Sequence, residues 1–171
     1  MKIFTYPEPV LREKARAVEN IDEEIQTLID RMAVTMYAAP GIGLAANQVG
    51  EPVRIIVFDL SPREEGYNLS VLINPEIVQA EGKATQEESC LSVIDFSAEV
   101  TRPACVKVRG VNRQGRPVEI DAEGLLSVCL QHEIDHLNGV LFIDHVSSLK
   151  RALYNKKLKK MLKKGMPQDK Q

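Results

Sequence analysis

The segment QHEIDHLNGVLF, Gln131 to Phe142, decides how the C-terminal half of this chain folds. His132 and His136 are four residues apart, so on a helix both imidazoles lie on one face and can reach one metal ion. Glu133 follows the first histidine, where a carboxylate can act as a general base in hydrolysis. Apolar residues recur at helical spacing before this segment, and an Asn-Gly pair ends the pattern. The sequence therefore predicts a helix over residues 124–138 that carries part of a metal-hydrolase site.

A catalytic metal site of this kind usually takes three protein ligands, and this segment supplies two. A third histidine six residues after the second would fall at Phe142, which cannot bind metal. A glutamate from a later helix is also excluded, because no glutamate follows Glu133. Asp144 and His145 come too soon after the helix end to fold back easily. We therefore expect the third ligand upstream.

The cysteines are the upstream candidates. Cys129 shares the helix face, but it lies about 7 Å along the axis from the midpoint of the histidine pair, whereas a cysteine Cα lies only about 4–5 Å from its metal. We expect Cys129 in the core or in a pocket wall. Cys105 alternates in phase with Lys107 and Arg109, so it should face outward or toward a second layer. By elimination we predict Cys90, which follows an acidic, irregular approach to a short extended segment.

The remaining pattern predicts an α+β fold, with antiparallel sheets packed around a central helix bearing the HExxH sequence and with a C-terminal amphipathic helix. Strands and helices do not alternate as they would in a parallel sheet. Asp22 is expected to cap the first helix. The expected elements are a helix over 21–37, strands over 54–60, 70–78, 106–111 and 116–122 with a hairpin turn at 113–115, a short extended piece over 141–146, and a helix over 147–164.

Length and composition limit the function classes. The 171 residues suit one domain, and a formal net charge of -2 gives no reason to expect DNA or another nucleic acid as substrate. No apolar run reaches membrane-spanning length, and the first residues do not form a signal peptide, so we expect a cytoplasmic protein without a membrane partner. An odd number of cysteines, three, disfavours a disulfide framework.

Three motifs then resemble the peptide deformylase family: GIGLAANQ at Gly41–Gln48, ESCLS at Glu88–Ser92 and QHEIDH at Gln131–His136. Their order and spacing agree with that family. The resemblance implies a catalytic domain over residues 1–149, followed by a basic C-terminal helix and tail over 150–171. It also implies an enzyme that removes the N-terminal formyl group from formyl-methionine of newly made polypeptides. The alternatives are a catalytically weak deformylase-like protein and a small HExxH metallopeptidase.

The resemblance also implies roles for individual residues. Cys90, His132 and His136 would hold one divalent metal, with Fe(II) as the physiological ion and zinc, nickel or cobalt able to replace it. Glu133 would transfer protons, while the Gln48 amide and the Leu91 backbone N–H would polarise the formyl oxygen. The implied substrate-binding residues are Ile42, Gly43, Glu88, Ser89, Leu125, Val128 and Cys129. On pattern alone, Leu91, Leu125, Val128 and Cys129 are most simply core residues.

Two departures from the family pattern lie in the second motif. Ser89 replaces the usual glycine beside the metal cysteine, and Ile94 stands where many members have proline. If position 89 required a positive φ, Ser89 would strain the site. We expect Ser89 to be tolerated, because every chemical group of the site is retained. The glycines of GIG are expected to form a tight turn that brings Gln48 to the metal.

The C-terminal tail is strongly basic. Its cations are Lys150, Arg151, Lys156, Lys157, Lys159, Lys160, Lys163 and Lys164, beside an apolar stripe of Leu149, Leu153, Leu158, Met161 and Leu162. A solvated charged face on a packed helix explains this pattern. Docking to ribosomal RNA also explains it, because basic helices bind phosphate backbones.

Overall fold

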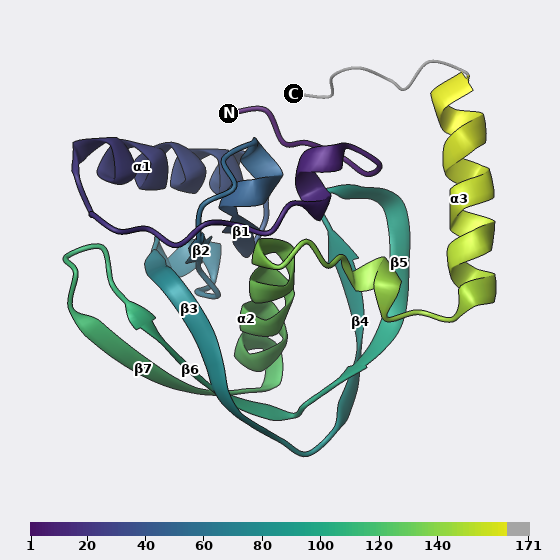
Figure 1. The fold of residues 1–171 in the computed structure, drawn as a ribbon. Coiled ribbons are helices and arrows are strands. Elements are labelled where there is room, and N and C mark those ends of the chain that lie inside the picture. The colour runs from purple at the N-terminus through teal and green to yellow at the C-terminus, as the bar shows by residue number, and fades with distance from the viewer. Residues whose placement is uncertain (164–171) are drawn as a thin grey trace.

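Two antiparallel sheets form the body of the computed structural model, which describes residues 1–163 (Figure 1). The larger sheet has the order β1-β2-β3-β6-β7, and strands β4 and β5 pair with each other. The strands are β1 (Gly43–Ala45), β2 (Ile55–Phe58), β3 (Ser70–Glu81), β4 (Ala84–Cys90), β5 (Val93–Arg102), β6 (Cys105–Val111) and β7 (Pro117–Glu123). The predicted α+β class with antiparallel sheets is confirmed.

The approach to Cys90 differs from the prediction. We expected an irregular segment, but β4 is a regular strand that pairs with β5 from Ala84↔Arg102 to Ser89↔Ser97. Most residues of β4 are charged or polar, so this strand lacks the β-branched alternation that marks a strand in the sequence. The hairpin turn predicted between β6 and β7 is present, with the Gly115 N–H donating to the Asn112 carbonyl at 2.9 Å.

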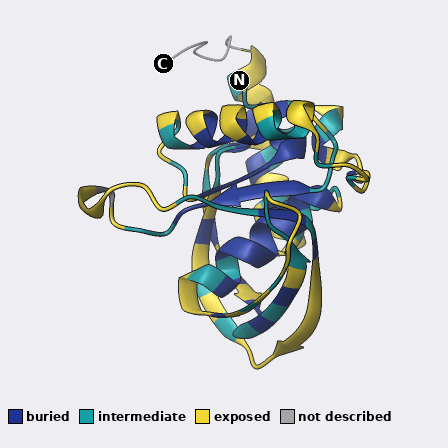
Figure 2. Ribbon diagram, turned by 90° about the vertical axis from the view of Figure 1, so that its left-hand side faces the viewer, coloured by how far each residue is buried: buried dark blue, intermediate teal, exposed yellow. Residues whose placement is uncertain are grey.

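Helix α1 (Glu23–Ala38) covers one side of the larger sheet. Its start is set by Asp22, whose side chain accepts a hydrogen bond from the Ile25 N–H at 3.0 Å, as the capping prediction required. Its apolar face, including Ile29, Met32 and Met36, is fully buried against β1, β2 and β3. The opposite side of α1 is exposed, as Figure 2 shows.

Helix α2 (Gly124–Leu137) lies in the hollow between the two sheets (Figures 1 and 2). Its apolar side chains, such as Leu130, Ile134 and Leu137, pack against the inner face of the larger sheet. The helix ends at Asn138 and Gly139, where Gly139 has a φ of 73°. This packing makes α2 a rigid support for the residues that it carries.

The segment after α2 corrects one prediction. Residues 141–146 were expected to be extended, but Phe142–Asp144 form one turn of 3₁₀ helix. The Asp144 carboxylate accepts a hydrogen bond from the Leu141 N–H at 2.9 Å, which favours a turn over a strand. Phe142 is 1% exposed and packs with Leu11, Val93 and Tyr154.

Helix α3 (Ser148–Lys163) confirms the predicted C-terminal helix. It stands at the side of the molecule, where Tyr154 and Leu158 pack into the same cluster as Phe142 (Figure 1). Lys164 and the rest of the predicted tail lie outside the described residues, and the division at residue 149 stays a prediction. None of the helices in residues 1–163 is long and apolar enough to cross a bilayer.

Candidate metal centre

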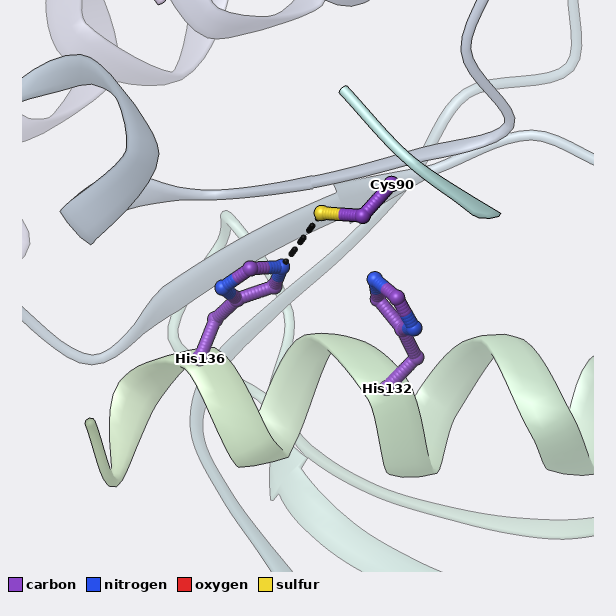
Figure 3. Close-up of side chains that lie close together, drawn as sticks. All are labelled: Cys90, His132 and His136. Carbon is purple, nitrogen blue, oxygen red and sulfur yellow. Dashed lines mark hydrogen bonds between the residues drawn. The ribbon is translucent and has the colours of Figure 1, made fainter. Parts of the chain in front are cut away.

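Three ligand side chains converge between α2 and the end of β4. His132 and His136 project from one side of α2, with their ring centroids 5.0 Å apart. The Cys90 sulfur faces them from the last residue of β4, and its distance to His136 Nε2 is 3.2 Å (Figure 3). One ligand atom from each residue lies within 4.8 Å of the other two. The structure therefore brings together the three residues predicted to bind metal.

The donor set fits a divalent metal. Tetrahedral coordination, with bonds of about 2.3 Å to sulfur and about 2.1 Å to nitrogen, separates a sulfur and a nitrogen ligand by about 3.6 Å. The Cys90 Sγ–His136 Nε2 distance of 3.2 Å is close to this value and all three ligand atoms lie within 4.8 Å of one another, so side-chain movements would complete the coordination. One sulfur and two imidazole nitrogens suit a soft divalent ion.

Glu88 and Arg102 support the His132 ligand. His132 Nδ1 lies 2.9 Å from Glu88 Oε2, which leaves Nε2 to face the metal position. The Arg102 guanidinium binds both Glu88 oxygens and also donates to Asp135 Oδ2 at 2.8 Å. Burial alone would raise the pKa of Glu88, but the hydrogen bonds from His132 and Arg102 outweigh it and lower that pKa to about 2. The Glu88 carboxylate is therefore charged and fully engaged.

This network was missed in the sequence. Arg102 and Asp135 belong to no predicted site, and His145 Nε2 extends the chain of contacts by binding Asp135 Oδ2 at 2.8 Å. Glu88 was expected to bind substrate; it lines the cavity, but its carboxylate binds His132 and Arg102. The one available signal was the acidic residue two positions before Cys90, which periodicity alone could not pair with an arginine.

Glu133 is buried beside the metal position. Its side chain is about 5% exposed, and its Oε2 atom has no hydrogen-bond partner among the described residues. Burial raises the pKa of this carboxyl to about 7. A buried carboxylate with a free oxygen and a pKa near neutrality has the properties of a general base.

Gly43 makes room for this carboxylate. A Cβ atom at position 43 would lie 2.6 Å from Glu133 Oε1 and 3.0 Å from Cys129 Sγ. The prediction of a tight turn at the GIG glycines was wrong for Gly43, which begins the short strand β1 and has no positive φ. Close approach of α2, rather than backbone conformation, is what requires glycine here.

The Gln48 amide is held at the opposite wall. Its Oε1 accepts a hydrogen bond from the Ala45 N–H at 2.9 Å, and its Nε2 donates to Ser92 Oγ at 3.1 Å. The same nitrogen lies 3.7 Å from Cys90 Sγ. The amide nitrogen therefore points toward the metal position.

A cavity of about 440 Å³ joins these groups. Except for His136, which lies beneath it, every predicted site residue lines this cavity: Ile42, Gly43, Gln48, Glu88, Ser89, Cys90, Leu91, Leu125, Val128, Cys129, His132 and Glu133. Leu125 is 53% exposed, so the prediction that this residue belongs to the core was wrong. Cys129 is buried in the cavity wall, and burial raises the pKa of its thiol, which disfavours a thiolate ligand.

Two other positions in the site resolve questions from the sequence. Ser89 lies in the regular part of β4 and does not have a positive φ, so the missing glycine leaves no backbone strain. Phe142, which occupies the ligand position of a known protease pattern, stacks against His132 with ring centroids 6.0 Å apart. Position 142 therefore carries an aromatic ring in place of a third metal ligand, and this ring restricts the movement of the His132 imidazole.

Comparisons with known proteins agree with this geometry. The sequence profile described as polypeptide deformylase matches residues 1–152. The peptide deformylase of Syntrophobacter fumaroxidans is 55% identical over 165 residues, which cover 96% of this chain and 97% of the relative. That of Mesorhizobium japonicum is 53% identical over 166 residues, covering 96% and 94%.

Solved structures are similar over nearly the whole chain. The crystal structure of a peptide deformylase from Legionella pneumophila has a TM-score of 0.90 and 45% identity, and the match covers 98% of both chains. A peptide deformylase from Synechococcus elongatus, crystallised with actinonin, has a TM-score of 0.83 and 42% identity, covering 93% of this chain and 84% of the other.

Proposed function

This chain belongs to the peptide deformylase family, and we propose from that premise how its own residues remove the N-terminal formyl group from the methionine of new polypeptides. The observation that carries the proposal is the convergence of Cys90, His132 and His136 at a cavity that also presents Gln48 and Glu133. The reaction is the hydrolysis of a formamide to formate and a free amine. The family membership favours this reaction over that of an HExxH metallopeptidase.

We propose that Fe(II) is the physiological ion and that zinc, nickel or cobalt can bind to the same ligands. When bound by Cys90, His132 and His136, the ion would activate a water molecule and polarise the formyl carbonyl. Glu88 would act on this site by orienting His132 and fixing which imidazole nitrogen faces the ion. Its carboxylate would therefore position a ligand rather than contact substrate.

Glu133 is the proton carrier of the proposal. Its carboxylate would accept a proton from the attacking water and would return it to the amine nitrogen as the C–N bond breaks. Its raised pKa suits both steps, because the group must bind the proton and then release it. Gly43 leaves space for the carboxylate at the cavity wall.

Two hydrogen-bond donors would stabilise the negative charge that develops on the formyl oxygen. Gln48 Nε2 carries two hydrogens: it donates to Ser92 Oγ at 3.1 Å and makes a longer contact of 3.7 Å with Cys90 Sγ, which a formyl oxygen would replace. The Leu91 backbone N–H would supply the second donor from the segment after Cys90. Donors that are already oriented stabilise the transition state without reorganisation.

The apolar walls of the cavity would select the methionine side chain. Leu125, Val128 and Cys129 line one side along α2, and Leu91 lines the cavity beside Cys90. An unbranched, flexible thioether fits such a slot without polar recognition. Gly43 and Ser89 lie in strands beside the cavity and Ile42 directly precedes β1, where an extended peptide would form backbone hydrogen bonds.

Formate release tests this proposal. Protein purified without air, because an iron–thiolate site is sensitive to oxidation, should release formate from a formyl-Met peptide. Glu133→Ala should retain metal but lose activity, whereas Cys90→Ala should lose both. Metal-loaded wild-type protein without activity would refute the function.

Ribosomal RNA is the second partner that we propose, bound through α3. Lys156 and Lys160 lie on the outward side of this helix, with the exposed Leu153, while Tyr154 and Leu158 face the core. Reversing both lysines to glutamate should weaken co-sedimentation with ribosomes and flatten its salt dependence. Lys14→Glu with Lys83→Glu, at exposed positions outside α3, is the control of equal charge change. Unchanged co-sedimentation of the α3 variant would refute this role.

We also propose that the protein is cytoplasmic.

A further inference from the structure

We infer that Ser92 is a positioning residue that holds the Gln48 amide in its catalytic orientation. This inference rests on the role proposed above for Gln48. Ser92 is 0% exposed, and its Oγ atom accepts the hydrogen bond from Gln48 Nε2 at 3.1 Å. It directly follows Leu91, so the segment that supplies one oxyanion donor also orients the other.

The Gln48 amide needs an external partner at its nitrogen. A glutamine side chain has three rotatable bonds, and rotation of the last one exchanges a donor for an acceptor. The Ala45 N–H fixes the oxygen end at 2.9 Å, and Ser92 Oγ fixes the nitrogen end. Without the hydroxyl, only the weak 3.7 Å contact with Cys90 Sγ would remain at the nitrogen.

Backbone hydrogen bonds hold Ser92 and Gln48 in register. The Tyr6 N–H donates to the Ser92 carbonyl at 2.8 Å, and the Phe4 N–H donates to the Gln48 carbonyl at 2.7 Å. The Ser92 N–H lies 3.4 Å from Cys90 Sγ. Because these contacts use the backbone, replacing Ser92 by alanine removes the hydroxyl and leaves the frame and the metal ligand in place.

A purely structural role for the hydroxyl makes a different prediction. It would change the free energy of unfolding without acting through Gln48. The chain offers a matched control in Ser127, which is also 0% exposed and whose Oγ accepts a hydrogen bond from the Gln131 amide at 2.9 Å. Ser127→Ala therefore removes the same kind of buried contact away from the reacting atoms.

A double-mutant cycle on the metal-loaded enzyme tests the inference. Removal of an oxyanion donor costs about 100-fold in kcat, and we expect that loss for Gln48→Ala. Ser92→Ala should lower kcat about 10-fold at nearly constant KM, with metal content unchanged. The double variant should be no slower than Gln48→Ala, because Ser92 acts through Gln48. Ser92→Thr, which keeps the hydroxyl, should recover kcat, and Ser127→Ala should remain within about 2-fold of wild type.

Nuclear magnetic resonance gives a readout that does not depend on turnover. In wild-type protein loaded with diamagnetic zinc, the two side-chain amide hydrogens of Gln48 should have chemical shifts displaced from those of a free glutamine and should exchange slowly with solvent. In Ser92→Ala these signals should move toward those of an unrestrained glutamine, whereas Ser127→Ala should leave them unchanged. This measurement also applies if Ser92→Thr folds poorly.

The outcomes separate two failures. If Gln48→Ala keeps normal kcat, the proposed role of Gln48 is wrong, and the inference about Ser92 falls with it. If Gln48→Ala is impaired while Ser92→Ala keeps normal kcat, only the inference about Ser92 is wrong. If the fold losses in kcat of the two single variants multiply in the double variant, Ser92 and Gln48 act independently. That result would also overturn the inference.

Discussion

Replacing Gly43 by alanine should damage catalysis by displacing Glu133. The added methyl group would lie 2.6 Å from Glu133 Oε1, whereas ordinary contact of a Cβ atom begins at 3.4 Å. The carboxylate would therefore have to move by about 0.8 Å to recover a normal contact. Cys129 Sγ, at 3.0 Å from the same position, blocks part of the available space.

The displacement is large on the scale of catalytic geometry. Catalytic groups need to be placed to within about 0.5 Å, and an error of about 1 Å can reduce rates by 10²-fold. The backbone of α2 cannot absorb the shift easily, because Leu130 and Ile134 are buried beside Glu133. We therefore expect kcat to fall by about 30- to 100-fold, which corresponds to about 2–3 kcal/mol of transition-state stabilisation.

The assay is formate release at saturating formyl-Met peptide, with metal content and thermal unfolding measured on the same samples. Overpacking should also cost about 1–3 kcal/mol of folding stability. Gly41→Ala is the matched control, because the nearest atom to its Cβ would be the terminal Cδ1 methyl of Leu91, at 2.8 Å, while Gly43 O and Met36 Cγ would lie at ordinary contact distances of 3.5 and 3.6 Å. That side chain can rotate away, so we expect less than about a 5-fold loss in kcat.

Near-normal kcat in metal-loaded Gly43→Ala would refute this reasoning. It would mean either that the Glu133 carboxylate tolerates displacement or that another group transfers the proton. An equal loss in Gly41→Ala and Gly43→Ala would also contradict the reasoning, since it would indicate a general sensitivity of residues 41–43 to added bulk.

Three further predictions concern residues around the metal. Glu133 must be deprotonated to accept a proton, and burial raises its pKa to about 7. The acid limb of kcat/KM should therefore rise with pH at a midpoint at or below 7, since a bound cation lowers this pKa; a wild-type rate that does not fall as the pH is lowered through the acid range, or an acid limb that persists unchanged in Glu133→Ala, would contradict it. Glu88→Gln should weaken metal binding about 10- to 100-fold in a chelator competition. Since the folded pKa of Glu88, about 2, lies below its ordinary 4.5, its contribution to stability is complete above pH 4.5 and is lost as the pH falls toward 2, so urea unfolding should show the largest difference from wild type near neutral pH. Phe142→Ala should cost about 3–5 kcal/mol in the same unfolding measurement, because its fully buried ring packs on His132.

Much of the fold followed from local pattern. The amphipathic spacing from Ile25 to Met36 and the Asp22 cap predicted α1, and the structure places both as expected. The HExxH helix was equally clear, since its histidine spacing and its Asn-Gly end are local features. The β4–β5 hairpin was largely missed, because β4 is mostly polar and has no apolar alternation, although β5 buries Val93, Ala98 and Val100 in an apolar cluster.

The candidate ligands could also be predicted from the sequence. Elimination led to Cys90, because the geometry of a single helix rules out Cys129 and because Phe142 cannot bind metal. The groups that orient these ligands could not be predicted. Arg102 reaches Glu88 across the hairpin and Asp135 on α2, and no spacing in the sequence indicates such contacts.

The sequence by itself determined the candidate metal ligands of this protein, because ligand type and helical spacing are local properties of QHEIDH and ESCLS. Only the tertiary structure decided how that chemistry is positioned. It placed Gly43 against Glu133, Ser92 against Gln48 and Phe142 against His132, and it formed the cavity that Gly43, Gln48, His132 and Glu133 line. The physical reason is that each of these contacts joins residues from different parts of the chain, so it exists only after those parts have packed together.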